Sequence, residues 1–134
     1  MFKIWRRGNR SIGSNGGVLS MNINVQFQKE GQIINGYIKG EIDTYTAPIL
    51  REELDALEFE KDVLIQIDLS KVSYLDSTGL GIFVAFYKKV VKENAHLKLV
   101  GLTARLIRLF EITGLSVLMD IETNTKVEYN NESI

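Results

Sequence analysis

Cysteine is absent from the 134 residues, and histidine and proline each occur once. Without cysteine the chain forms no disulfides and no thiolate metal sites, and one histidine excludes a two-histidine metal site within one chain. No apolar run approaches the roughly 18 residues that a membrane helix needs. The missing cysteine is compatible with a reducing cytoplasm, where we expect the protein. We expect no metal and no cofactor.

Neither sign of charge is in clear excess, because 16 basic and 17 acidic residues leave a net charge of −1. This balance gives no long-range attraction for nucleic acid or anionic lipid, so we expect neither a direct nucleic-acid partner nor a membrane. Hydrophobic residues make up 45% and charged residues 25% of the chain. These values are typical of a globular protein and exclude a disordered one. The length suits a single domain.

Residues 1–20 differ in composition from the rest of the chain. They contain four bases and no acid, are rich in Gly, Ser and Asn, and show no apolar period. A secretory signal peptide would need an apolar core segment, which this stretch lacks. We therefore interpret residues 1–20 as a cloning leader or a natural extension without regular structure. Residues 21–134 are then the folded domain, with 12 bases, 17 acids and a net charge of −5.

Strand and helix periods alternate along this domain. Period-two alternation predicts strands over 22–28 and 32–39, where Gly36 interrupts the pattern and suggests a bulge. The near-continuous apolar run 63–69 is typical of a strand buried on both faces. Further strands are predicted over 97–100 and 117–121. The tail from residue 122 is polar, which is typical of a short helix or a frayed end.

Three helices are predicted between these strands. The first begins within 44–48, where Thr44 or Thr46 supplies a cap and Pro48 fits the first turn. Its apolar stripe is Ala47, Leu50, Leu54 and Leu57. The second helix follows the segment 76–79, and the third runs from a Thr103 cap to a stop at Thr113–Gly114. We therefore expect an α/β fold: a mixed sheet of about four to five strands, with helices packed mainly on one face.

The segment Tyr74-Leu-Asp-Ser-Thr-Gly-Leu-Gly81, between a buried strand and an amphipathic helix, is the most informative. Asp, Ser and Thr are all favoured helix caps, so capping alone would account for them. However, one capping residue suffices, and Gly79 and Gly81 weaken the first helical turn. Small residues leave the start of the helix open, and free backbone amides there accommodate a negative group. Ser77 is therefore a candidate phosphate acceptor.

Catalysis by this segment has little support in the sequence. Ser77 lacks the surrounding pattern of a nucleophile elbow, and the one candidate base, His96, is more simply a surface or edge residue before a strand. Gly79-x-Gly81 lacks both the lysine of a phosphate-binding loop and the third glycine of a dinucleotide site. We therefore predict that the protein is not an enzyme.

Two other pairs of charged residues have both a structural and a functional interpretation. Glu41 and Asp43 suit a turn with helix capping, or a polar rim beside the Ser77 loop. Both loops follow strands, and partners gather outside the carboxyl ends of strands in open α/β sheets. Arg105 and Arg108 on the third helix are most simply a solvated face.

Three segments together resemble one family. Gly40-Glu-Ile-Asp-Thr-Tyr-Thr-Ala-Pro48, Ser73-Tyr-Leu-Asp-Ser-Thr-Gly-Leu-Gly81 and Arg105-Leu-Ile-Arg-Leu-Phe-Glu-Ile-Thr-Gly-Leu115 stand in this order. The chain thereby resembles the STAS-domain anti-sigma factor antagonists of Gram-positive bacteria, and among them the sigma-B general stress type. The resemblance covers about residues 21–121 and implies a single STAS-type domain.

The resemblance also implies a function. In that family the unphosphorylated antagonist binds an anti-sigma factor that is also a serine kinase, and the sigma factor is released. Phosphorylation blocks this binding, and a PP2C-type serine phosphatase reverses it. Carried over, the phosphorylated residue is Ser77. The implied partner-binding residues are Asp43, Thr44, Tyr45, Thr46, Asp76, Thr78, Gly79 and Leu80.

Two alternatives stay open at this point. Related scaffold proteins of the stress-signalling complex share the fold, although they often carry extra N-terminal domains or a threonine-centred motif. An enzyme or a small-ligand carrier that uses the 74–81 loop is the other alternative.

Overall fold

The computed structural model describes residues 3–12 and 21–123. One mixed sheet has the strand order β1-β2-β3-β4-β5-β6. Its strands are β1 (Lys3–Ile12), β2 (Met21–Glu30), β3 (Ile33–Ile42), β4 (Leu64–Leu75), β5 (His96–Leu102) and β6 (Asp120–Thr123). The helices are α1 (Ala47–Ala56), α2 (Ser77–Lys92), α3 (Ala104–Ile112) and α4 (Leu115–Leu118).

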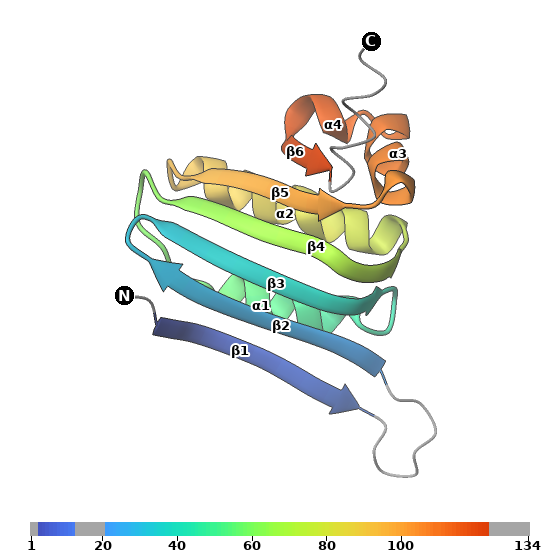
Figure 1. The fold of residues 1–134 in the computed structure, drawn as a ribbon, viewed down its shortest axis with the longest axis horizontal. Coiled ribbons are helices and arrows are strands. Elements are labelled where there is room, and N and C mark those ends of the chain that lie inside the picture. The colour runs from blue at the N-terminus through green and yellow to red at the C-terminus, as the bar shows by residue number, and fades with distance from the viewer. Residues whose placement is uncertain (1–2, 13–20, 124–134) are drawn as a thin grey trace.

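The first three strands are antiparallel neighbours, and β3, β4, β5 and β6 are parallel. Helices α1 and α2 both lie behind the sheet, whereas α3 and α4 lie beside its β5–β6 end (Figure 1). The parallel order places the carboxyl ends of β3, β4 and β5 at one edge, on the right in Figure 1, where α3 also lies. The predicted α/β fold with helices mainly on one face is confirmed.

Strand β1 is the main departure from the sequence prediction. Residues 3–12 pair antiparallel with β2, with one register shift between Ile4 and Arg6. We expected no regular structure in residues 1–20, and that expectation is wrong for 3–12. An edge strand needs only a backbone ladder on one side, so its sequence need not show an apolar period. The sheet thus has six strands among the described residues. That the segment is a leader outside the domain stays a prediction.

The core lies between the sheet and helices α1 and α2. In β2 the alternate side chains Ile23, Val25 and Phe27 are buried, as their spacing predicts. The same alternation continues along the neighbouring strands, and the largest fully buried side chains include Phe27, Phe83 and Phe110. Burying one such aromatic side chain stabilises a fold by about 1.5–3 kcal/mol. The helices are therefore held mainly by this apolar contact.

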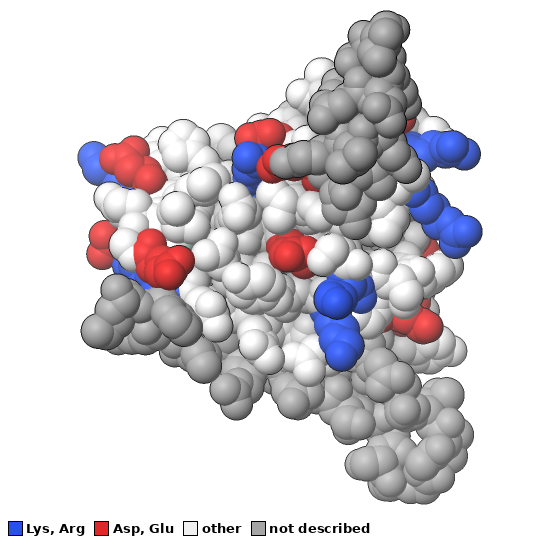
Figure 2. All heavy atoms as spheres, in the orientation of Figure 1, with Lys and Arg blue, Asp and Glu red and all other residues white. Residues whose placement is uncertain are grey.

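The other face of the sheet is open over the described residues. In β4, Ile65 and Ile67 are fully buried, but Gln66 between them and Asp68 after them are only half-buried. The prediction that 63–69 is buried on both faces is therefore wrong. Scattered charged side chains of both signs lie on this open face (Figure 2). β4 also continues without a break to Leu75, because register shifts against β3 absorb the irregular residues at 70–71.

Gly36 has a packing role in place of the expected bulge. Its register with Phe27 is regular, and a Cβ at Gly36 would lie 2.8 Å from Cε1 of the Phe27 ring. The glycine therefore gives the ring room to cross β3. The predicted strand over 117–121 is wrong in part, because residues 115–118 form α4 and β6 begins at Asp120. Gly114, at φ +82, ends α3 as predicted and starts this extra turn.

Candidate functional site

The site is built where β3 and β4 end side by side. Ile42 pairs with Leu75, and the backbone N–H of Asp76 donates to the carbonyl of Ile42 at 3.3 Å. The loop after β3 and the loop after β4 are therefore joined directly. This confirms the expectation that both loops share one edge of the sheet.

In the loop after β3, side chains provide the hydrogen bonds that strand pairing provides within β3. Asp43 Oδ1 accepts hydrogen bonds from the N–H groups of Tyr45 at 2.9 Å and Thr46 at 3.0 Å. Thr46 Oγ1 donates to the Glu41 carbonyl at 2.7 Å and accepts from the Asp43 N–H at 3.0 Å. Such short side-chain bonds are typical of turns that precede helices. Asp43 and Thr46 thus fix the loop and the start of α1.

The predicted cap of α1 is wrong in detail. Thr46 stands at the N-cap position, but its hydroxyl makes no capping bond to the helix. Instead, the backbone N–H of Ala47 donates to the Asp43 carbonyl at 2.8 Å. Pro48 lies in the first turn as expected. Of the predicted rim, Thr44 and Tyr45 are exposed, Asp43 is half-buried, and Thr46 is only 2% exposed.

The loop after β4 is capped by Asp76. Its Oδ1 accepts from the N–H groups of Thr78 at 3.0 Å and Gly79 at 3.1 Å. Asp76 is therefore the helix cap, and Ser77 is the first residue of α2. Ser77 and Thr78 are exposed. Because Asp76 alone caps the helix, the hydroxyl of the exposed Ser77 has no capping role.

The two glycines of this loop differ. Gly79 is buried, and a Cβ there would lie 2.3 Å from Leu75 Cδ1 and 2.6 Å from Ile42 Cγ2. Gly81 is exposed, and a Cβ there would meet nothing within 4 Å. Gly79 therefore allows α2 to approach the ends of β3 and β4 closely. Leu80 is 5% exposed and belongs to the core. Of the residues predicted for the partner-facing surface of this loop, Thr78 is exposed and Asp76 is half-buried, whereas Gly79 and Leu80 are buried.

Two exposed tyrosines flank this edge. Tyr45 is 63% exposed and Tyr74, two residues before the Asp76 cap, is 48% exposed. Tyr74 was not among the predicted partner-binding residues. The sequence feature that could have indicated Tyr74 is its aromatic side chain between Val72 and Leu75, both of which are buried. Together Ser77, Thr78, Thr44 and the tyrosines form what we call the switch edge.

Catalytic chemistry is not assembled at the switch edge by the described residues. His96 begins β5 and pairs with Leu64 at the start of β4, whereas Ser77 follows the end of β4. His96 is exposed, as predicted for a surface residue. Over the described ranges no three His, Asp or Glu side chains gather as a metal site. None of the helices in this part of the chain has the length and apolar character needed to span a bilayer.

Comparison with known proteins agrees with this architecture. The model of the STAS domain family matches residues 24–128, which include the whole switch edge.

The chain belongs to the STAS-domain family.

Curated relatives of this STAS domain carry a common name. The anti-sigma-B factor antagonist of Bacillus subtilis is 49% identical over 106 residues, which are 79% of this chain and 96% of that protein. The protein of the same name from Listeria monocytogenes is 42% identical over 114 residues, with 84% and 99% coverage. A crystal structure of an anti-sigma factor antagonist from Mycobacterium paratuberculosis superposes with a TM-score of 0.66 at 26% identity. It covers 82% of this chain and 93% of that one.

Proposed function

We propose that this STAS domain is an anti-sigma factor antagonist switched by phosphorylation of Ser77. In its unphosphorylated form it binds an anti-sigma factor that is also a serine kinase, and the sigma factor is released. Phosphorylation of Ser77 ends this binding, and a PP2C-type serine phosphatase restores it. The observation that carries the proposal is the exposed Ser77 hydroxyl at the first residue of α2, beside an Asp76 that already caps the helix. The names of the curated relatives support the antagonist role.

The geometry supports a switch that acts at the interface. A phosphoryl group on Ser77 adds about −1.5 to −2 charges at pH 7. Asp76 Oδ1 already occupies the N–H groups of Thr78 and Gly79, so the phosphate oxygens have to find other partners. They would lie beside the Asp76 carboxylate and face solvent. A partner that covers this edge must bury the added charge next to a like charge, which is strongly unfavourable.

No catalytic group of its own is needed for this function. The transferred phosphoryl group comes from the ATP of the kinase, and the phosphatase supplies the hydrolysis. The STAS domain contributes an edge at which the phosphorylated residue, Ser77, is exposed. The hydrogen bond from Asp76 to Ile42 and the packing of Gly79 keep that edge in place.

The first test is intact-mass spectrometry after incubation with the cognate anti-sigma kinase and Mg-ATP. Wild type should gain a single phosphoryl group, and Ser77→Ala should gain none. The matched control is Ser73→Ala, because Ser73 is an exposed serine near the end of β4, four residues before Ser77. That control should be phosphorylated like wild type. Phosphorylation of Ser77→Ala to the wild-type extent would contradict the assignment of Ser77.

Binding to the anti-sigma factor is the second test. Ser77→Ala should bind as tightly as wild type, even in the presence of ATP. Ser77→Asp should bind at least about tenfold more weakly, because it places a second carboxylate beside Asp76. Isothermal titration calorimetry measures both affinities. If Ser77→Asp bound like wild type, a charge at this position would not be the switch.

A further inference from the structure

A groove of about 290 Å³ lies between the end of β4 and α3. Val72, Leu75 and Leu106 line its buried part, and Tyr74 and Ile112 line its open part. Ile112 is 74% exposed and Tyr74 is 48% exposed, which is unusual for large apolar side chains that lie on one surface. Exposed apolar side chains that line one groove offer a contact for the apolar side chains of a partner.

Two arginines give this groove a charge. Arg105, Arg108 and Ile112 all line it from α3. They are three or four residues apart, so they form one stripe of the helix. The opposite stripe, with Leu106 and Phe110, is buried. Basic side chains project from the edge of the molecule beside α3 (Figure 2).

The two arginines are the charged side chains among the described residues that line the groove. Neither arginine has an ion pair with a described residue, and none of the described residues lining the groove is acidic. Arginines in such a setting favour a partner with carboxylates, because guanidinium groups bind carboxylates in a planar, bidentate way. An occupant with basic side chains would meet repulsion instead.

The groove is continuous with the switch edge. Tyr74 and Leu75 line it, and the next two residues of the chain are Asp76 and Ser77. The side chain of Leu75 also lies directly below Gly79. A protein seated over Ser77 therefore reaches the groove without crossing other surface.

We propose that the groove receives an acidic amphipathic segment of the anti-sigma factor. Apolar side chains of this segment lie between Tyr74 and Ile112, and its carboxylates pair with Arg105 and Arg108. The inference rests on the proposed function and adds a second contact to it, one that lies away from the phosphorylated residue. It explains why α3 carries an exposed apolar and basic stripe opposite its buried one.

The test is charge reversal by the double substitution Arg105→Glu and Arg108→Glu. Both side chains are exposed, so the variant should fold, which circular dichroism and the thermal midpoint check. Its affinity for the anti-sigma factor at low salt should fall at least about tenfold. The matched control is Lys61→Glu with Lys88→Glu, which changes the net charge equally at exposed sites outside the groove. Its affinity should stay within about twofold of wild type.

A second variant removes apolar contact without changing charge. Ile112→Ser should weaken binding about fivefold and leave the thermal midpoint nearly unchanged, because the side chain is 74% exposed. An unchanged affinity of both groove variants would overturn the proposal. Equal losses in the groove and control double variants would overturn it too, because net charge would then account for the effect.

Two further outcomes separate this inference from the proposed function. If wild type binds the anti-sigma factor and is phosphorylated on Ser77 while the groove variants behave like wild type, only the groove assignment fails. If wild type neither binds nor is phosphorylated, both proposals fail. Tighter binding by the charge-reversed variant would mean that the segment seated in the groove is not acidic, which would also overturn the proposal.

Discussion

At the scale of single residues, Gly79 and Gly81 show how similar sequence positions differ in their surroundings. Both lie in the first turns of α2, but a Cβ at Gly79 would overlap Leu75 and Ile42, and a Cβ at Gly81 would lie in open space. Ile42 is fully buried and branched at Cβ, so it has little freedom to move aside. Gly79→Ala should therefore lower the free energy of unfolding by about 1–3 kcal/mol.

Gly81→Ala is the matched control and should have the opposite sign. Alanine is favoured over glycine within a helix by up to about 1 kcal/mol, and nothing obstructs its methyl group here. Urea unfolding of the two variants beside wild type measures both changes. A stabilised Gly79→Ala would mean that α2 does not pack closely against Ile42 and Leu75. It would also remove the physical reason for a glycine after Ser77 and Thr78.

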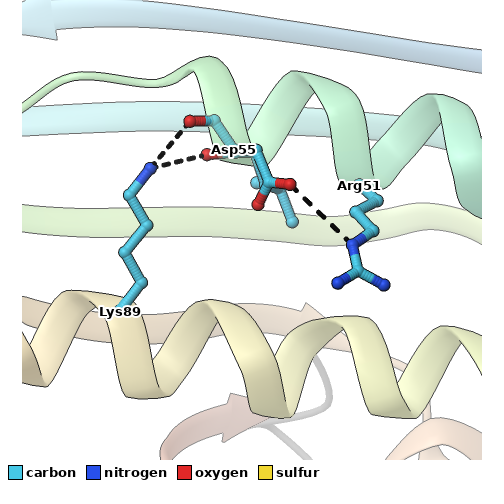
Figure 3. A network of polar contacts seen from close by, with 4 residues as sticks. Arg51, Asp55 and Lys89 are labelled. Carbon is cyan, nitrogen blue, oxygen red and sulfur yellow. Dashed lines mark hydrogen bonds and ion pairs between the residues drawn. The ribbon is translucent and has the colours of Figure 1, made fainter.

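At the scale of elements, a cross-helix contact fixes α1 against α2. Lys89 of α2 donates to three carbonyls at the end of α1, those of Leu54 at 3.3 Å, Asp55 at 2.9 Å and Leu57 at 3.1 Å. Two of these hydrogen bonds are drawn in Figure 3. The last carbonyls of a helix have no partner within it, and a cation there also favours the helix dipole. The ammonium group further lies 5.6 Å from the centre of the Phe59 ring.

Removing this ammonium group should destabilise the domain. Lys89→Met keeps most of the side-chain length and loses the three hydrogen bonds, so we expect a loss of about 1–3 kcal/mol. Arg51, also in Figure 3, provides the contrast, because its 3.8 Å ion pair with Asp55 is about two-thirds exposed on both sides. Arg51→Met should cost under about 0.5 kcal/mol. Equal losses in thermal unfolding would contradict the special role of Lys89.

Sequence patterns predicted the elements that bury a stripe and failed where burial is not periodic. The stripe of α1 and the alternation of β2 are both buried as predicted, because side-chain spacing alone decides which face meets the core. β1 was not predicted, because backbone hydrogen bonding to one neighbouring strand requires no periodic pattern of apolar residues in the sequence. The same limit applies to the site. The two loops were correctly assigned to one edge, but Gly79 and Leu80 were expected at the surface, and only the packing against Ile42 and Leu75 reveals their burial.

At the scale of the whole molecule, phosphorylation of Ser77 should change charge without changing the fold. The net charge of the chain would move from −1 to about −3. The favourable effect of an anion near the start of α2 is at most about 1 kcal/mol at an exposed site, and the neighbouring Asp76 carboxylate opposes it. We therefore expect the free energy of unfolding to differ by less than about 1 kcal/mol between the two forms.

Urea unfolding of the phosphorylated and unphosphorylated chain measures this difference, and the slope of the transition reports the surface exposed. Similar midpoints and slopes, together with lost affinity for the anti-sigma factor, would place the whole switch at the interface. A loss of several kcal/mol, or a smaller slope, would mean instead that the phosphate unfolds the start of α2. The edge formed by Asp76, Ile42 and Gly79 argues for the first outcome, because its bonds and packing lie beneath Ser77 and do not involve its hydroxyl.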